Sequence, residues 1–276
     1  MPAAREDIRD FLRREPASML IEVVGAAGST PRDTDAWMLV SERAIFSTIG
    51  GGQLEHMAID QARRALRLQT AAGTMNVPLG PEIGQCCGGR VNLALTAVDA
   101  RLARDLVARS DREIAARAHV YVFGAGHVGD ALAMALSLAP LRVILVDTRE
   151  DELAASTVPR IETCLTAIPE AVVHDAPAGS SFVILTHDHA LDFLIAREAL
   201  ARADLAYTGM IGSATKRATF ANWLSREAGG ERSWLDRLTL PIGGSAVKDK
   251  RPHVIAAMTA AEILTALASY RDRSSS

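Results

Sequence analysis

Apolar positions in the first hundred residues follow both a helical and a strand period. Helical spacing of apolar side chains predicts two helices, over 7–14 and 54–68. Short apolar runs and a clear alternation predict four strands, over 19–24, 37–40, 44–48 and 90–98. Residues 1–98 are therefore expected to form a mixed α/β domain, and the Ala- and Arg-rich stretch 99–118 a helical connector.

The pattern changes at His119, where short β-branched runs begin to alternate with longer helical patterns. The strand pattern covers 119–123, 142–147, 181–186 and 205–211. The helix pattern covers 128–138, 191–202, 214–228 and 252–269. Because strands that alternate with helices of this length form βαβ units, residues 119–276 are predicted to fold as a Rossmann-type parallel-sheet domain.

A glycine-rich turn follows the first strand of this second domain. Gly124, Gly126 and Gly129 match G-x-G-x-x-G, and Asp147 ends the next strand. In dinucleotide folds such a turn directs a helix N-terminus at a phosphate. His127 would face that ligand, and Arg149 brings a cation beside Asp147. The alternative is that the glycines serve only the packing of strand on helix.

Further polar residues follow the later strands and are expected on the same edge of the sheet. His187 and His189 could contact a pterin or a phosphate, or bind a metal. They could also be structural, with one of them capping the next helix. Ser213 is expected to cap the helix from residue 214. Lys216 and Arg217 in its first turn are either a second anion contact or solvated charges.

Two glycine-flanked segments of the first domain carry candidate chemistry. Gln85, Cys86, Cys87 and Gly88 precede the strand over 90–98. Adjacent cysteines lack the spacing of a Cys-x-x-Cys metal site, so a single soft thiolate ligand, a persulfide carrier or buried apolar thiols are the alternatives. The glycine loop within 47–55 is either an anion cradle or a turn that needs positive φ.

Composition excludes several classes of protein. The 276 residues are 49% hydrophobic and 23% charged, as in a globular protein. A net charge of −3 and 4% aromatic residues argue against a nucleic-acid binder. The longest apolar-looking stretch, 131–141, is too short to cross a membrane, and no signal peptide is evident. Three cysteines form no disulfide framework, which favours the cytoplasm.

Taken together, the motifs resemble those of the xanthine dehydrogenase accessory protein family, XdhC/CoxI. The resemblance runs almost from end to end, and seven motifs occur in the family's order. They are 28–32 (GSTPR), 48–52 (TIGGG), 84–89 (GQCCGG), 123–129 (FGAGHVG), 146–149 (VDTR), 186–189 (THDH) and 211–213 (IGS). One departure is 241–250 (PIGGSAVKDK), where the family often has Gly-Leu-Asp-Ile-Gly, so this loop is left out of the expected site.

The resemblance implies a chaperone for the molybdenum cofactor (molybdopterin) and not a turnover enzyme. Such a protein holds the cofactor, preferably in its sulfurated form, and delivers it to the xanthine dehydrogenase apoenzyme. Cys86 and Cys87 would contact the molybdenum, and the glycines of 124–129 would hold the pterin phosphate. A cysteine desulfurase that sulfurates the cofactor is an implied partner, and a homodimer is the implied assembly.

Two other functions compete with the chaperone. The glycine turn alone is typical of an NAD(P)-dependent oxidoreductase. That function needs acid–base chemistry beside the nicotinamide, and the first hundred residues contain one histidine, His56, inside a predicted helix. The third alternative is a metal or sulfur relay that uses Cys86 and Cys87 without a pterin.

Overall fold

The structure is a computed structural model that describes residues 7–27, 36–70, 72–79, 89–244 and 246–274. It divides into two compact units, Met1–Ala115 and Ala116–Ser276. The expected sites at Gln85, Cys86, Cys87 and Gly88 lie outside the described residues.

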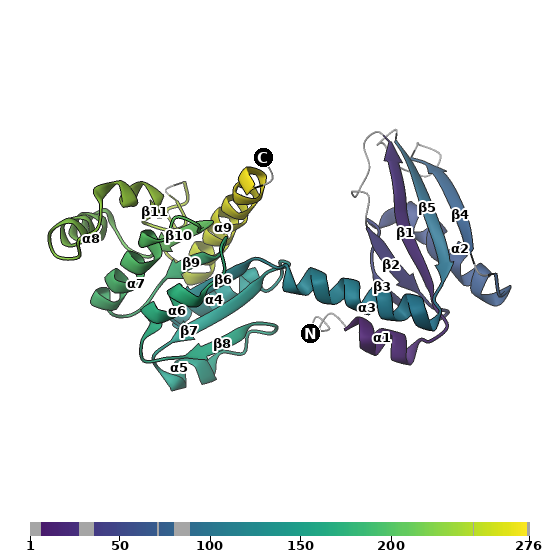
Figure 1. Cartoon of the computed structure of the whole chain (residues 1–276), viewed down its shortest axis with the longest axis horizontal. Coiled ribbons are helices and arrows are strands. Elements are labelled where there is room, and N and C mark those ends of the chain that lie inside the picture. The colour runs from purple at the N-terminus through teal and green to yellow at the C-terminus, as the bar shows by residue number, and fades with distance from the viewer. Residues whose placement is uncertain (1–6, 28–35, 71, 80–88, 245, 275–276) are drawn as a thin grey trace. The chain divides into compact units, whose positions relative to one another are not determined.

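The first unit is built on a five-stranded antiparallel sheet in the order β3-β2-β1-β5-β4 (Figure 1). Its strands are β1 (Met19–Ala27), β2 (Trp37–Val40), β3 (Ile45–Ser47), β4 (Ala72–Pro78) and β5 (Arg90–Ala97). Strand β4 was not predicted, since it lies at the sheet edge and buries only Val77. Without an apolar face a strand has no alternating pattern to detect.

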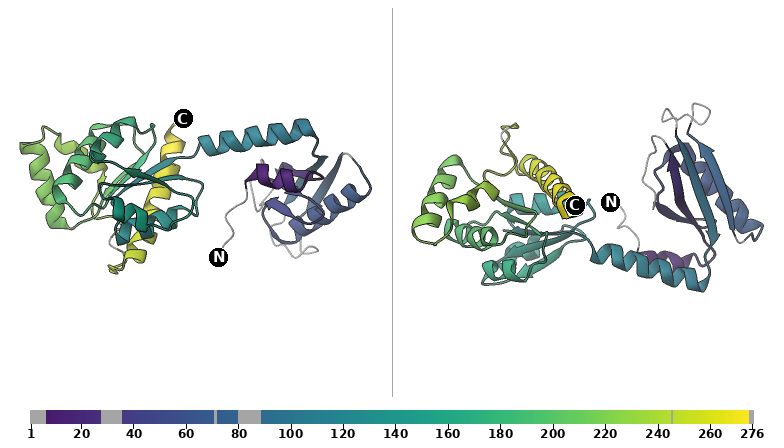
Figure 2. Two further views of the ribbon diagram at one scale, coloured as in Figure 1. Left: turned by 90° about the horizontal axis from the view of Figure 1, so that it is seen from below. Right: turned by 45° about the horizontal axis from the view of Figure 1, so that its top comes forward.

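In the described part of the first unit, three helices cover this sheet, α1 (Ile8–Arg14), α2 (Gly52–Arg67) and α3 (Ala100–Ala115). The apolar face of α2, with Leu54 and Ala58, packs against one sheet face. Phe11 of α1 and Leu106 of α3 pack against Leu39 in a separate cluster, and the right view of Figure 2 shows α2 apart from the other two helices. The predicted connector segment thus contains α3, which belongs to the first compact unit.

Strand register places the ends of β1 and β4 and the start of β5 at the same end of this sheet. Arg90, the first residue of β5, pairs with Ala27 at the end of β1 and with Pro78 at the end of β4. The segments 28–35 and 80–88, which lie outside the described residues, therefore attach to the sheet at neighbouring points. Those segments carry the first and third of the seven motifs.

The second unit has a six-stranded parallel sheet in the order β11-β10-β9-β6-β7-β8. Its strands are β6 (His119–Phe123), β7 (Arg142–Asp147), β8 (Glu162–Leu165), β9 (Ser181–Ile184), β10 (Tyr207–Met210) and β11 (Leu238–Thr239). The chain order reverses between the neighbours β6 and β9. This is the strand order of a Rossmann fold, whose ligands bind at that switch point.

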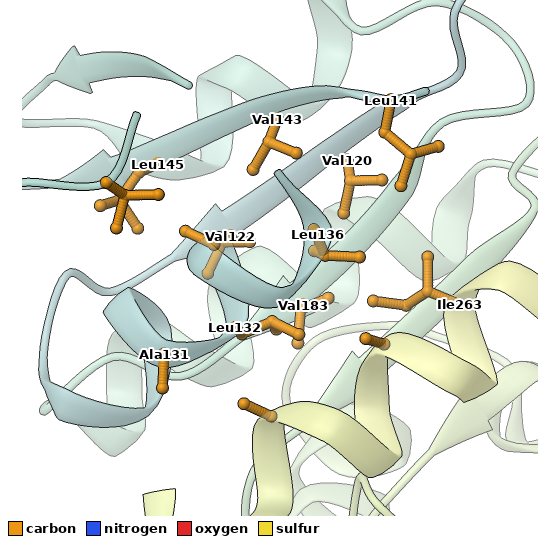
Figure 3. Packing of buried hydrophobic residues seen from close by; sticks show 14 of the residues in the cluster. Val120, Val122, Ala131, Leu132, Leu136, Leu141, Val143, Leu145, Val183 and Ile263 are labelled. Carbon is orange, nitrogen blue, oxygen red and sulfur yellow. The ribbon is translucent and has the colours of Figure 1, made fainter. Parts of the chain in front are cut away.

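Helices cover both faces of the parallel sheet. They are α4 (His127–Leu136), α5 (Glu150–Ala155), α6 (Pro169–Asp175), α7 (His189–Ala201), α8 (Ala214–Arg226) and α9 (Pro252–Ser274), with a 3-10 helix over Arg232–Arg237. On one face, Leu132 and Leu136 of α4 meet Ile263 of α9 over Val122 and Val183 (Figure 3). On the other, side chains of α6, α7 and α8 form a second core with β9 and β10.

Helix α9 is long and apolar enough to cross a membrane by the criteria of length and composition, so the expectation that 131–141 is the longest apolar stretch was wrong. In this fold it is a packing helix. Ala256, Ile263 and Leu267 are buried in the core that it shares with α4. Its other apolar residues are partly buried, such as Ile255 and Met258, or exposed, such as Leu264 and several alanines.

Candidate functional site

The glycine turn lies at the switch point between β6 and α4, and its glycines have different roles. A Cβ atom on Gly124, which has φ +112°, would lie 2.5 Å from the Leu185 carbonyl oxygen. A Cβ atom on Gly129 would lie 1.8 Å from the Gly124 carbonyl oxygen. Both positions exclude every side chain, so these two glycines serve the packing of strand on helix.

Gly126 differs from its two neighbours in the motif. Its φ is −72°, and no atom lies within 4 Å of the place where a Cβ would be. It is the N-cap of α4 and supplies no side-chain cap, so the first backbone N–H groups of the helix point to the carboxyl edge of the sheet. This is the geometry with which helix N-termini bind anions, and His127 is the first residue of that helix.

Asp147 is buried at the end of β7, and both of its carboxylate oxygens accept hydrogen bonds from within the protein. Its Oδ2 accepts from Ala125 N at 2.7 Å and from Arg149 Nη2 at 2.9 Å. Its Oδ1 accepts from Arg149 N and Nε, both at 3.0 Å. Desolvation raises the pKa of Asp147, but the hydrogen bonds from Arg149 and Ala125 outweigh it, so the pKa is lowered.

Arg149 is held from two sides. Its Nη1 donates to Glu152 Oε1 at 3.0 Å, in addition to its contacts with Asp147. Hydrogen bonding to Asp147 raises the pKa of Arg149. Asp147 therefore fixes both the glycine turn and Arg149, whereas a dinucleotide fold uses this acid to bind a ribose hydroxyl. Direct contact of either side chain with a cofactor stays a prediction.

The carboxyl ends of β6, β7 and β9 border a crevice. His187, just after β9, lies across this crevice from the glycine turn. A cavity of about 10 Å³ lies between the strand ends, enough for about one water molecule. Its walls include Gly124, Asp147, Thr148, Pro169, Thr186 and His187. The structure therefore brings the ends of β6, β7 and β9 together, as expected for residues that follow parallel strands.

His189 lies outside this cavity, as the first residue of α7. Its side chain is 80% exposed, with Nδ1 3.9 Å from Asp192 Oδ2. Helix α7 is capped by Asp188, whose Oδ1 accepts from Ala190 N at 2.8 Å, so the alternative in which a histidine caps this helix was wrong. Among the described residues no three His, Cys, Asp or Glu side chains gather as metal ligands.

Ser213 caps α8 as predicted, since its Oγ accepts from Lys216 N at 3.3 Å. The two cations that follow have partners inside the protein, so the alternative of solvated charges was wrong. The Lys216 side chain is 10% exposed, and its Nζ donates to Asp192 Oδ2 and to the Ile211 carbonyl oxygen. Arg217 donates to the carbonyl oxygens of Leu235 and Leu238, so it holds the chain that leads into β11.

Sequence reasoning missed Asp192, although a signal was available. A carboxylate between Leu191 and Phe193, on the buried face of an apolar helix, requires a buried partner. Only the fold identifies that partner as Lys216, 24 residues later. The apolar neighbours could therefore have indicated a buried ion pair without naming its second member.

The glycine loop of the first unit already holds an anion from its own chain. Glu55 Oε2 accepts from Ile49 N and Gly51 N, both at 3.1 Å, and from the Thr48 hydroxyl. Gly50 and Gly51 have φ of +127° and +80°. The expectation of a positive-φ turn is confirmed, and the cradle is filled by the side chain of Glu55.

Comparisons with known proteins agree for both units. The family model described as the XdhC Rossmann domain matches residues 120–263, and that of the XdhC and CoxI family matches 12–76. The uncharacterized protein YqeB of Escherichia coli is 26% identical over 254 residues, which are 89% of this chain but 42% of YqeB. The chain thus spans about two fifths of that relative's length.

A solved structure supports the fold. A crystal structure described as a xanthine dehydrogenase from Bacillus halodurans superimposes with a TM-score of 0.78 at 17% identity, covering 96% of each chain. At this identity the likeness establishes the architecture alone. The Rossmann model by itself spans more than half of the chain, and the second model matches the first unit. The chain therefore belongs to the XdhC and CoxI family.

Proposed function

We propose that this protein is an accessory factor in xanthine dehydrogenase maturation, which binds the molybdenum cofactor and delivers it to the apoenzyme. The observation that carries the proposal is the open N-terminus of α4 at Gly126, in a chain of the XdhC and CoxI family. Molybdopterin carries a phosphate group, and backbone N–H groups at a helix N-terminus suit such a group. The protein would hold its cargo without turning it over.

The residues on the carboxyl edge would have distinct tasks. Gly126 and the first N–H groups of α4 would bind the phosphate, with His127 and His187 beside it. Gly124, Gly129, Asp147 and Arg149 would support this edge. Ser213 and His189 belong to neighbouring helix starts and are assigned to the outer part of the site.

The molybdenum end of the cargo needs a soft ligand, which we assign to Cys86 or Cys87. Thiolates suit thiophilic metals, and the cofactor would be preferred in its sulfurated form. A cysteine desulfurase would supply that sulfur, and a cytoplasmic homodimer would be the working form. The acceptor enzyme we propose is of the kind named for the Bacillus halodurans structure, a xanthine dehydrogenase.

The test is to purify the protein without oxygen from a host supplied with molybdate. Bound molybdenum and the fluorescent oxidation products of the pterin are then measured on the same sample. We expect both in comparable amounts, and transfer of both to a cofactor-free xanthine dehydrogenase with recovery of activity. A protein that carries neither, under conditions where the host makes the cofactor, would contradict the proposal.

An NAD(P)-dependent oxidoreductase is the second candidate, favoured by the strand order of the second unit. The hydrogen bonding of Asp147 argues against an oxidoreductase. Four donors already bind its two oxygens, so it has no free acceptor for a ribose hydroxyl. This feature leads us to place the pterin cargo first.

A further inference from the structure

A buried ion pair joins α7 to α8 behind the crevice. Asp192 of α7 has no exposed surface, and the Lys216 side chain of α8 is 10% exposed. Asp192 Oδ2 accepts from Lys216 Nζ, which also donates to the Ile211 carbonyl oxygen at 3.0 Å. Because Ile211 directly follows β10, the pair ties both helices to the carboxyl end of that strand.

The other oxygen of Asp192 holds the turn that carries His187. Asp192 Oδ1 accepts from Thr186 N at 3.0 Å and from Thr186 Oγ1 at 2.7 Å. Thr186 Oγ1 in turn accepts from Asp188 N at 3.3 Å. His187 lies between these two anchored residues, so the short turn from β9 into α7 is closed on the carboxylate of Asp192.

The distribution of buried acids supports a role at the crevice. In the described part of the chain, two acidic residues are buried, Asp147 and Asp192. Asp147 anchors the glycine turn on one side, through Ala125 N, and Asp192 anchors the His187 turn on the other. Both walls of the crevice are thus held by carboxylates, each neutralised by a cation, Arg149 or Lys216.

A buried ion pair is weak support for stability as such. Removing one partner is costly, but replacing both by apolar residues of similar size is often neutral or stabilising. Asp192 provides something that an apolar residue cannot, which is an acceptor for both the amide and the hydroxyl of Thr186. The ion pair therefore helps to fix the turn after β9 at the carboxyl edge of the sheet.

We propose that Asp192 and Lys216 are positioning residues that hold His187 against the ligand crevice, so that ligand affinity depends on the pair. The identity of the ligand rests on the proposed function, whereas the positioning of His187 does not. Neither residue needs to touch the ligand, since both act through Thr186 and the turn that follows it.

The test uses the full chain with the double variant Asp192→Leu/Lys216→Met, which keeps the core apolar and removes the acceptor for Thr186. The matched control is Arg202→Met, which breaks a partly buried ion pair with Asp204 and two contacts to the carbonyl oxygens of Val173 and Ala176. Arg202 precedes β10 and so lies at the opposite edge of the sheet.

Two readouts are taken on each variant below its unfolding temperature. One is the dissociation constant for molybdenum cofactor released from a molybdoenzyme. The other is the NMR signal of the His187 imidazole, assigned with His187→Gln. We expect the double variant to bind roughly tenfold more weakly than the parent and to shift and broaden the His187 signal. Arg202→Met should leave both readouts unchanged.

A double variant that keeps the parental affinity and the parental His187 signal would overturn the inference. If the parent binds no cofactor, the proposed function fails, and the His187 signal alone decides the positioning role. If the double variant does not fold, Thr186→Val replaces it. That change removes the hydroxyl between Asp188 and Asp192 and leaves the ion pair intact.

Discussion

Gly126 is the residue at which folding and ligand binding can be separated. Because no atom lies within 4 Å of its missing Cβ and its φ is −72°, the fold accepts a side chain there. We expect Gly126→Val to melt within a few degrees of the parent and to lose cofactor binding, since the side chain would cover the first N–H groups of α4. Thermal melting and bound molybdenum are compared on one preparation.

Gly129→Ala is the control for that substitution. Its Cβ would overlap the Gly124 carbonyl oxygen at 1.8 Å, so the strand and helix must separate. We expect a loss of about 3 kcal/mol in the free energy of unfolding. If Gly126→Val destabilised the protein as much as Gly129→Ala, Gly126 would be a packing residue and the phosphate assignment would lose its basis.

Cys86→Ala and Cys87→Ala test the sulfur chemistry. Glycines flank the pair on both sides, so truncating a thiol to a methyl group should cost little packing. We expect both variants to be soluble and folded, with one of them unable to supply active cofactor, because neighbours in an extended segment point to opposite sides. Reconstitution of cofactor-free xanthine dehydrogenase measures this. Full activation by both variants would make the pair structural.

At the scale of elements, Asp147 joins the end of β7 to the turn after β6, and this contact should depend on pH. The pKa of Asp147 is lowered from 3.8. Its contribution to stability is therefore present above the unfolded value and is lost as the pH falls through the folded value. We expect Asp147→Asn to cost about 1–3 kcal/mol at pH 7 and less below pH 3.8.

Urea unfolding at pH 7 and pH 3 measures the two differences. The control is Asp151→Asn, which removes an exposed acid from the first turn of α5. A penalty for Asp147→Asn that is equally large at both pH values would show that shape, and not the charge of Asp147, holds the glycine turn.

Glu55 determines how α2 begins. It accepts two backbone N–H groups and the Thr48 hydroxyl in a turn whose N-cap, Gly51, has no side chain. We expect Glu55→Ala to cost about 1–2 kcal/mol in urea unfolding. Glu42→Ala, at an exposed acid 4.0 Å from Arg67, should change stability by less than about 0.5 kcal/mol. Equal losses of stability for Glu55→Ala and Glu42→Ala would show that Glu55 does not cap α2.

For the whole molecule, the choice of ligand separates the two candidate functions. An adenine dinucleotide needs an acceptor for its ribose, and Asp147 is already saturated with donors. We expect calorimetry to detect cofactor binding that neither NAD(H) nor NADP(H) reduces at micromolar concentration. Micromolar binding of a nicotinamide cofactor without binding of molybdopterin would reverse the ranking of the two functions.

The sequence alone was sufficient for the fold class and the family. Strand and helix periods in 119–276 predicted the parallel sheet, and the Rossmann model over 120–263 confirms it. Local patterns succeed here because buried strands of a covered parallel sheet are apolar throughout. The edge strands β4 and β8 escaped prediction, since Thr74 and Glu162 belong to strands that face solvent.

Only the tertiary structure decided which charged and glycine residues are open to a ligand. Within one motif, Gly126 is open while Gly124 and Gly129 are enclosed, although the sequence shows three equivalent glycines. From the sequence, Lys216 is expected to be a surface cation, but in the fold α8 brings its Nζ into an ion pair with Asp192. Residue type and spacing predict local structure, because they depend on neighbours along the chain. Whether a hydrogen-bonding group already has a partner depends on atoms that the fold brings there from distant segments.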